Sequence, residues 1–280
     1  MSRFIATGSP DGKTKLAVYL DELDIDPSNA CVLARNLNFK TVCLRRVWTT
    51  NVGRATDDAC RIVMSAIQAN NLEVLAVCTD HGQTNNLTVD NSIERSIIIG
   101  GYFRAKYMRF FAGTGRGQVA SYRIGAPLSD VAKSWFTGIG DLCVKHKITP
   151  LLEIESGATF FEPEEVLRVL AVHPAWRLLY DPAQLVIGRN HNPFERYWLK
   201  MRDKVEAIDL HDFLPSAGFV PIGSGNGRVG DTIYDAISSN YNGWYIVEPG
   251  AIRRSAIVIS KPELVSDVTK LFLATLSEIQ

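Results

Sequence analysis

Four short apolar runs in the second half of the sequence each end on side chains that can bind a metal ion. The runs are residues 151–155 (LLEIE), 177–181 (RLLYD), 205–211 (VEAIDLH) and 244–248 (WYIVE), and they carry Glu153, Asp181, Asp209 with His211, and Glu248. Runs of this form are typical of buried strands that emerge at the open end of a parallel barrel. Because charged groups there are costly unless they pair or coordinate a cation, the four endings predict one shared divalent metal ion.

The residue types also indicate which metal this site would bind. A set made mostly of carboxylates favours Mn²⁺, Mg²⁺ or Co²⁺, with Zn²⁺ as the alternative. Side chains alternate along a strand, so Glu153 and Glu155 point the same way, as do Asp209 and His211. The sequence therefore leaves open whether Asp209 or His211 supplies the fourth ligand.

These candidate ligands need a scaffold of alternating strands and helices. The expected strands are residues 15–19, 41–45, 73–78, 107–111, 150–155, 176–181, 205–211 and 243–247. The expected helices are residues 26–37, 55–70, 91–106, 128–146, 163–172, 194–202, 230–239 and 262–279. This order predicts parallel βα units in a single (β/α)₈ TIM barrel spanning residues 1–280. An open doubly wound sheet is the competing architecture, but no GxGxxG motif follows the first strand.

The amino-acid composition limits the classes of binding partner that are expected. Lys plus Arg and Asp plus Glu each number 30, which gives no support to a polyanion-binding surface, so neither nucleic acid nor membrane is an expected partner. The five cysteines lack CxxC spacing and are expected to be buried free thiols in a reducing compartment. No window is apolar enough for a signal peptide or a membrane span. The expectation is a cytoplasmic enzyme with a small-molecule substrate.

Several of these segments, taken in order, resemble the xylose-isomerase-like TIM barrels. The likeness is carried by Leu152-Glu-Ile-Glu-Ser-Gly, Leu179-Tyr-Asp-Pro-Ala-Gln-Leu, Ile208-Asp-Leu-His-Asp and Gly243-Trp-Tyr-Ile-Val-Glu, and it covers most of the chain. That superfamily contains sugar isomerases and epimerases, inosose dehydratases and apurinic endonucleases. The resemblance implies a metal held by Glu153, Asp181 and Glu248, with the fourth ligand from residues 205–211. Members usually carry His-x-Lys-Asp there, so by register Asp209 takes the place of the His and His211 that of the Lys.

The resemblance also implies a reaction. Glu153 and Glu248 match the acid/base pair of the isomerase and epimerase branches, in which a proton moves next to a carbonyl and the metal stabilises an enediolate. The expected function is a metal-dependent sugar or sugar-phosphate isomerase or epimerase. Glu155 and Gln184 stand where many members have histidine and are expected to contact substrate. Members often associate through their barrel faces, so a homo-oligomer, dimer or tetramer, is expected.

Three other functions are compatible with the same scaffold. A lyase that dehydrates a cyclic polyol or keto acid would use the same metal, and a non-catalytic ligand-binding barrel would have lost turnover with the altered histidines. An apurinic endonuclease needs a histidine-rich three-zinc cluster, which a chain with five histidines and Gln184 does not favour.

A few residues outside the four runs are weaker candidates. His81 follows a strand and is a candidate for substrate contact or for a turn, and Arg45 is a candidate for a substrate oxygen or for an ion pair. The glycine-rich residues 223–227, with Arg228, are a candidate anion cradle. Residues 113–117 are also glycine-rich but lack the Lys-Ser/Thr of a P-loop, which favours an active-site loop.

Overall fold

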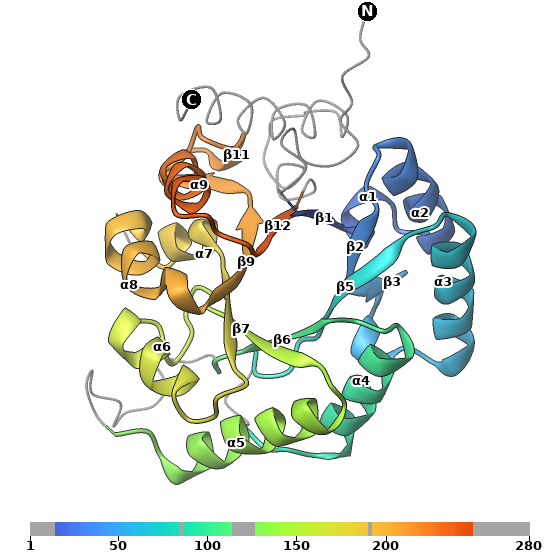
Figure 1. Cartoon of the computed structure of the whole chain (residues 1–280), viewed down its shortest axis with the longest axis horizontal. Helices are drawn as coiled ribbons and strands as arrows, with labels where there is room; N and C mark the ends of the chain where they lie inside the picture. The colour runs from blue at the N-terminus through green and yellow to red at the C-terminus, as the bar shows by residue number, and fades with distance from the viewer. Residues whose placement is uncertain (1–14, 84–86, 114–126, 190–191, 249–280) are drawn as a thin grey trace, which may run out of the picture.

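Eight parallel strands close into a barrel in the order β1, β2, β5, β6, β7, β8, β9, β12, and β12 pairs back with β1 (Figure 1). This computed structural model describes residues 15–83, 87–113, 127–189 and 192–248. The strands are β1 (Lys15–Tyr19), β2 (Thr41–Leu44), β5 (Glu73–Cys78), β6 (Tyr107–Phe111), β7 (Thr149–Glu153), β8 (Arg177–Tyr180), β9 (Val205–Leu210) and β12 (Trp244–Val247). The predicted (β/α)₈ barrel is confirmed, and each predicted strand is present to within one or two residues.

Helices surround the barrel (Figure 1). They are α1 (Leu20–Leu23), α2 (Pro27–Asn36), α3 (Asp57–Ala69), α4 (Asn91–Tyr102), α5 (Asp130–Lys145), α6 (Pro163–Leu170), α7 (Pro182–Ile187), α8 (Leu199–Met201) and α9 (Val229–Ser238). Side-chain caps fix several of their starts: Asp26, Thr56, Asp90 and Ser129 each accept a hydrogen bond from a first-turn amide. The sequence did not predict α1 and α7, which are short, and the helix expected at 262–279 lies outside the described residues.

The helix predicted at 194–202 has a mixed form. It begins as a π-helical turn, η2 (Phe194–Trp198), continues as α8 and ends in a 3₁₀ turn, η3 (Arg202–Lys204). Another 3₁₀ turn, η1 (Val52–Arg54), precedes α3. Among the described helices, none is long and apolar enough to span a membrane.

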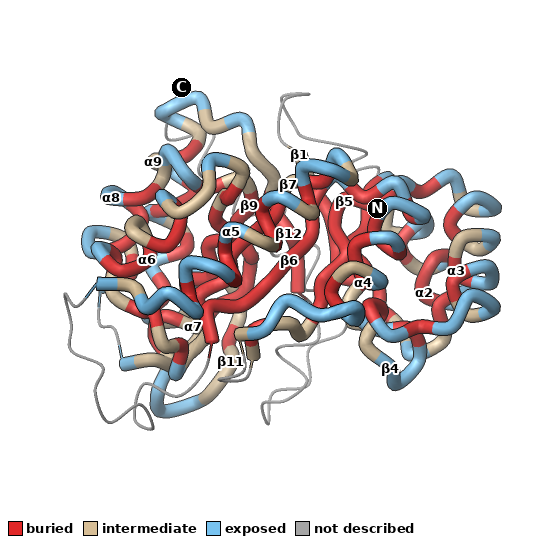
Figure 2. The backbone as a smooth tube through the Cα atoms, turned by 90° about the horizontal axis from the view of Figure 1, so that it is seen from below, coloured by how far each residue is buried: buried red, intermediate tan, exposed pale blue. Residues whose placement is uncertain are grey.

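Alternation along the strands separates two apolar layers. Side chains alternate along the strands except in β5, where the pairing with β2 shifts register at Leu75. The smaller of the two clusters contains Ala17, Tyr19, Cys43, Leu75, Ala76, Cys78, Tyr107, Leu151, Leu179, Ala207 and Ile246. The intervening residues pack against the helices, so the buried strands lie inside a shell of helices with exposed outer faces (Figure 2). All five cysteines are buried and free, as predicted.

Two small hairpins lie beside the barrel, and the sequence predicted neither. The first pairs β3 (Arg46–Val47) with β4 (Thr50–Asn51), directly after β2. The second pairs β10 (Asp212–Leu214) with β11 (Gly218–Val220), directly after β9. Both follow the C-terminal end of a barrel strand, where TIM-barrel sites are built.

Candidate active site

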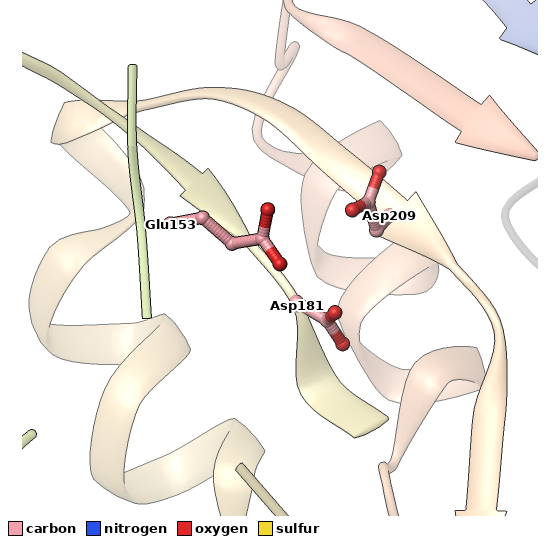
Figure 3. A group of neighbouring side chains, drawn as sticks. All are labelled: Glu153, Asp181 and Asp209. Atoms are coloured by element: carbon pink, nitrogen blue, oxygen red, sulfur yellow. The ribbon is translucent and has the colours of Figure 1, made fainter. Parts of the chain in front are cut away.

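Three buried carboxylates meet at the C-terminal end of the barrel. Glu153 is the last residue of β7, Asp181 directly follows β8, and Asp209 lies in β9. Each offers an oxygen, and these oxygens all lie within 4.8 Å of one another (Figure 3). We call Glu153, Asp181 and Asp209 the carboxylate triad. The sequence left Asp209 and His211 open as the fourth ligand, and Asp209 is the one that belongs to this cluster.

His211 connects the triad to Glu248. Its Nε2 lies 2.7 Å from Oδ1 of Asp181, and its Nδ1 lies 3.5 Å from Oε2 of Glu248. Burial alone lowers the pKa of His211, but the carboxylates of Asp181 and Glu248 outweigh burial and raise this pKa to about 10. Glu248 therefore lies beside the triad, joined to it through a cationic imidazole.

Two arginines hold the glutamates that the resemblance singled out. Nη1 of Arg109, in β6, lies 2.7 Å from Oε2 of Glu153, and both side chains are buried. Nη1 of Arg45, which directly follows β2, lies 2.8 Å from Oε1 of Glu248. Arg45 also pairs with Asp21 and Glu22, so of the two roles considered for Arg45, the structure places it in an ion-pair network.

Burial and neighbouring negative charges raise the pKa values of two acidic groups in the site, Glu153 and Asp209. Burial raises the pKa of Glu153 to about 7; Arg109 lowers this pKa, while Asp181 and Glu248 raise it. Burial also raises the pKa of Asp209, with Asp181 and Glu153 adding to the effect. The Tyr19 hydroxyl lies 3.1 Å from each carboxylate oxygen of Asp209 and donates to that carboxylate. The Asp209 carboxylate is therefore held in place by the hydroxyl of Tyr19, a residue of the barrel interior.

Asp181 serves two purposes. Its Oδ1 accepts a hydrogen bond from the amide of Gln184 and thereby caps the start of α7. The same oxygen faces His211. Its position and orientation are thus fixed by the helix that it begins.

A cavity of about 530 Å³ opens above the triad, within the size range of small-molecule sites. Six residues predicted for the site line it: Glu153, Glu155, Asp181, Gln184, His211 and Glu248. Asp209 lies at the triad without lining the cavity. Gln83 Nε2 lies 3.4 Å from Oε2 of Glu155, and Oε1 of Gln184 accepts a hydrogen bond from the Ser156 amide at 3.2 Å.

Two predicted substrate contacts are placed elsewhere. His81 does not line this cavity; its Nε2 lies 2.9 Å from Oγ of Ser96, and its ring stacks on Phe110. Arg228 is absent from the lining too, and it pairs with Glu195 and Asp231 outside the cavity. The turn role that the sequence offered for His81 is the one that this geometry favours.

Sequence reasoning missed other residues that line the cavity. Arg109 interrupts the otherwise apolar strand YMRFF, and a lone charge in such a strand was the available signal. Phe219, in the β10/β11 hairpin, stacks on His211 with ring centroids 5.5 Å apart. No pattern in the sequence marked Phe219, because its hairpin was not predicted.

The donor set suits a divalent metal ion. Three carboxylates supply hard oxygen ligands, the kind that Mg²⁺ and Mn²⁺ prefer. Arg109 bonds to Oε2 of Glu153 and His211 to Oδ1 of Asp181, so the other oxygen of each carboxylate remains for a cation. Glu153, Asp181 and Asp209 would hold the metal, with Glu248 next to them.

Comparisons with known proteins bear on the fold. No family model matches the sequence, and no curated protein matches it by sequence. Among solved structures, the chain is similar to a D-tagatose 3-epimerase-like protein, with a TM-score of 0.71 and 14% identity over 95% of this chain and 99% of that chain. A xylose isomerase-like TIM barrel protein from Mycobacterium smegmatis, solved in complex with magnesium, gives a TM-score of 0.66 and 15% identity over 98% of this chain and 100% of that one.

A third similar structure has a different described activity. The probable 3-DHS dehydratase AsbF from Bacillus anthracis gives a TM-score of 0.68 and 14% identity over 93% of this chain and 99% of that chain. Sequence identities this low show the fold alone. The chain has the fold of the xylose isomerase-like TIM barrel proteins.

Proposed function

We propose that this protein is a metal-dependent sugar isomerase or epimerase that moves a proton on the carbon next to a carbonyl. The observation that carries the proposal is the carboxylate triad, with oxygens within 4.8 Å of one another at the catalytic end of the barrel. When bound, a divalent metal would polarise the substrate carbonyl and stabilise negative charge on its oxygen. Mg²⁺ or Mn²⁺ is the proposed ion.

In this proposal Glu153 and Glu248 move the proton. The Glu153 carboxylate lines the cavity, where it can accept a proton from the substrate and return it. Glu248, which directly follows β12, lines the same cavity, held by Arg45 on one oxygen and by His211 on the other. Two carboxylates lining one cavity are the arrangement that proton removal and return require.

The remaining polar side chains in the cavity would hold the substrate. Glu155 lies in the loop after β7 and Gln184 lies in the first turn of α7, and they present acceptors and donors for hydroxyl groups. His211 adds a cationic donor between Asp181 and Glu248. These groups fit a polyhydroxylated carbonyl compound.

The test is hydrogen exchange during turnover. The protein, loaded with Mn²⁺, is incubated in D₂O with a panel of ketoses and aldoses, and deuterium on the carbon next to the carbonyl is measured by mass spectrometry. Glu153→Gln should abolish the exchange, whereas Glu164→Gln, at a surface ion pair with Lys200, should leave it intact. Wild-type protein that binds no divalent metal and exchanges no substrate proton would favour the non-catalytic barrel.

A dehydratase is the second candidate. It is favoured by His211, an imidazole that lines the cavity between Asp181 and Glu248, and by the fold similarity to the probable 3-DHS dehydratase. Incubation with inosose-type substrates separates the two functions, because a dehydratase produces loss of water and an epimerase produces a stereoisomer of equal mass.

A further inference from the structure

The glycine-rich residues 223–227 form an anion cradle that the protein already fills. The occupant is the fully buried carboxylate of Asp212, the residue after His211. Its Oδ2 accepts hydrogen bonds from the amides of Gly223 at 3.1 Å and Gly225 at 2.9 Å. Its Oδ1 accepts from the amides of Gly227 at 2.8 Å and Phe213 at 2.9 Å.

Glycine is required at positions 225 and 227 because the Asp212 carboxylate lies where a Cβ atom would be. A Cβ at position 225 would lie 2.4 Å from Oδ1 of Asp212, and one at position 227 would lie 2.7 Å from the same oxygen. Gly223 has a φ of +84°, which side-chain-bearing residues rarely adopt. The glycine pattern that suggested a site for a bound anion is therefore explained by an internal one, and Arg228 pairs with Glu195 and Asp231 instead of assisting it.

Two of the three arginines in the described cavity lining are also engaged in ion pairs. Arg45 is bonded to Glu248, Asp21 and Glu22, and Arg109 is bonded to Glu153. Among the described lining residues, this leaves Arg46, exposed in β3, as the remaining guanidinium. Within the described part of the lining, therefore, no second arginine is left to converge with Arg46 on a phosphate group.

The overall charge of the described site points the same way. The lining carries six carboxylates, from Asp21, Glu22, Glu153, Glu155, Asp181 and Glu248, against three guanidinium groups and His211. With Asp209 and a divalent cation included, seven carboxylates face five positive charges, an excess that a charge on His211 would reduce but not remove. A dianionic substrate group would therefore enter against like charge.

Neutral hydroxyl groups find partners in the same cavity. The side-chain oxygen of Gln184, Oε1, accepts a hydrogen bond from the backbone amide of Ser156. The side-chain nitrogen of Gln184 therefore points the other way, where it can donate to a hydroxyl group. Glu155 supplies acceptor oxygens on the neighbouring loop. Phe219 adds an apolar ring beside His211, of the kind that packs against the C–H face of a sugar.

From these contacts we propose that the substrate is an uncharged, unphosphorylated polyhydroxy carbonyl compound, and that Asp212 closes the one described glycine cradle to phosphate. This inference rests on the proposed function and decides between the sugar and the sugar phosphate.

The first experiment compares free ketoses with their phosphate esters on the Mg²⁺-loaded wild-type protein. We expect kcat/KM for proton exchange to be about tenfold or more higher for the free sugar, because like charge opposes the ester. We also expect that inorganic phosphate does not compete with the sugar. The ³¹P resonance of inorganic phosphate should not broaden when protein is added. A preference for the ester, or competition by phosphate at millimolar concentration, would overturn the inference.

The second experiment does not depend on turnover. Asp212→Ala empties the cradle, so phosphate should raise the melting temperature of this variant and broaden the ³¹P signal, while wild type and Asp231→Ala, at an exposed aspartate nearby, should show neither effect. If Asp212→Ala folds only when phosphate is present, the cradle is equally demonstrated. If the variant does not fold at all, the ³¹P measurement on wild type decides. Absence of all turnover together with absence of phosphate binding would count against the proposed function and not against the closed cradle.

Discussion

Arg109 and Glu153 lie on neighbouring strands, and their side chains form a buried ion pair with 2.7 Å between Nη1 and Oε2. Arg109 also donates to the carbonyl of Thr79, which fixes the guanidinium on the side of β5. A fixed positive charge thus lies against a carboxylate that is proposed to bind a metal ion. The arginine and the metal compete electrostatically for Glu153.

Removing that charge should strengthen metal binding. For Arg109→Gln we expect the Kd for Mn²⁺ to fall by about tenfold, because like charges a few ångströms apart in a partly buried site repel by 1 kcal/mol or more. Isothermal titration calorimetry measures the change. Arg54→Gln, which removes an exposed ion pair with Asp80, should leave the Kd unchanged. An unchanged or higher Kd in Arg109→Gln would show that the arginine organises the site without opposing the cation.

The stability of the metal-free protein should fall as the pH rises from about 4.5 to about 7. The pKa of Glu153 is raised from its ordinary 4.5 to about 7 in the folded state, so the folded protein holds this proton more tightly than the unfolded chain does. Folding is therefore favoured at low pH, and up to about 3 kcal/mol is lost as the carboxylate ionises inside the barrel.

Glu153→Gln should remove that part of the pH dependence. The free energy of unfolding, measured in EDTA at several pH values, should change less between pH 4.5 and 7 in this variant than in wild type. Glu164→Gln provides the matched control, since its carboxylate lies at the surface. Parallel curves for wild type and Glu153→Gln would contradict the prediction.

The contribution of His211 to stability should change at higher pH than that of Glu153. Its pKa is raised from 6.5 to about 10, so its stabilising interaction with Asp181 and Glu248 is fully present below pH 6.5 and is lost as the pH rises through 10. In metal-free protein, the ¹⁵N resonances of a labelled His211 imidazole should show protonation up to about pH 9. A midpoint near 6.5 would mean that the two carboxylates do not hold the proton.

Two substitutions at Asp181 should separate its roles. Asp181→Asn keeps an oxygen for the Gln184 amide, so α7 should remain capped while metal binding weakens. Asp181→Ala removes the cap as well, at a further cost of about 1 kcal/mol in stability. Thermal unfolding in EDTA reports the cap, and metal content after dialysis reports the ligand. Equal melting temperatures for the two variants would exclude a capping role.

Much of the scaffold could be predicted from the sequence because it depends on local pattern. The apolar runs that end in Glu153, Asp181 and Asp209 mark strands, and strand ends in a parallel barrel meet at one rim. Caps such as Ser129 before α5 gave helix starts to within a residue or two. Residues far apart in the sequence were therefore placed together by topology alone.

The rest depended on partners that no local pattern reveals. Arg109 acquires its role from Glu153, 44 positions away, and the glycines of residues 223–227 acquire theirs from Asp212. Glu248 was predicted as a metal ligand from its strand end, but whether its oxygen joins the triad or faces His211 is decided by side-chain packing. The β10/β11 hairpin is too short for its periodicity to be detected.

The carboxylate enclosed by residues 223–227 indicates how easily this loop could bind an external anion. Three backbone amides of this loop already converge on a carboxylate, which belongs to the residue after the cavity-lining His211. Removing the Asp212 side chain would leave these amides available to an external anion without any change in the loop. Under the proposed function, a single substitution at Asp212 would then provide a binding site for the phosphate group of a sugar ester.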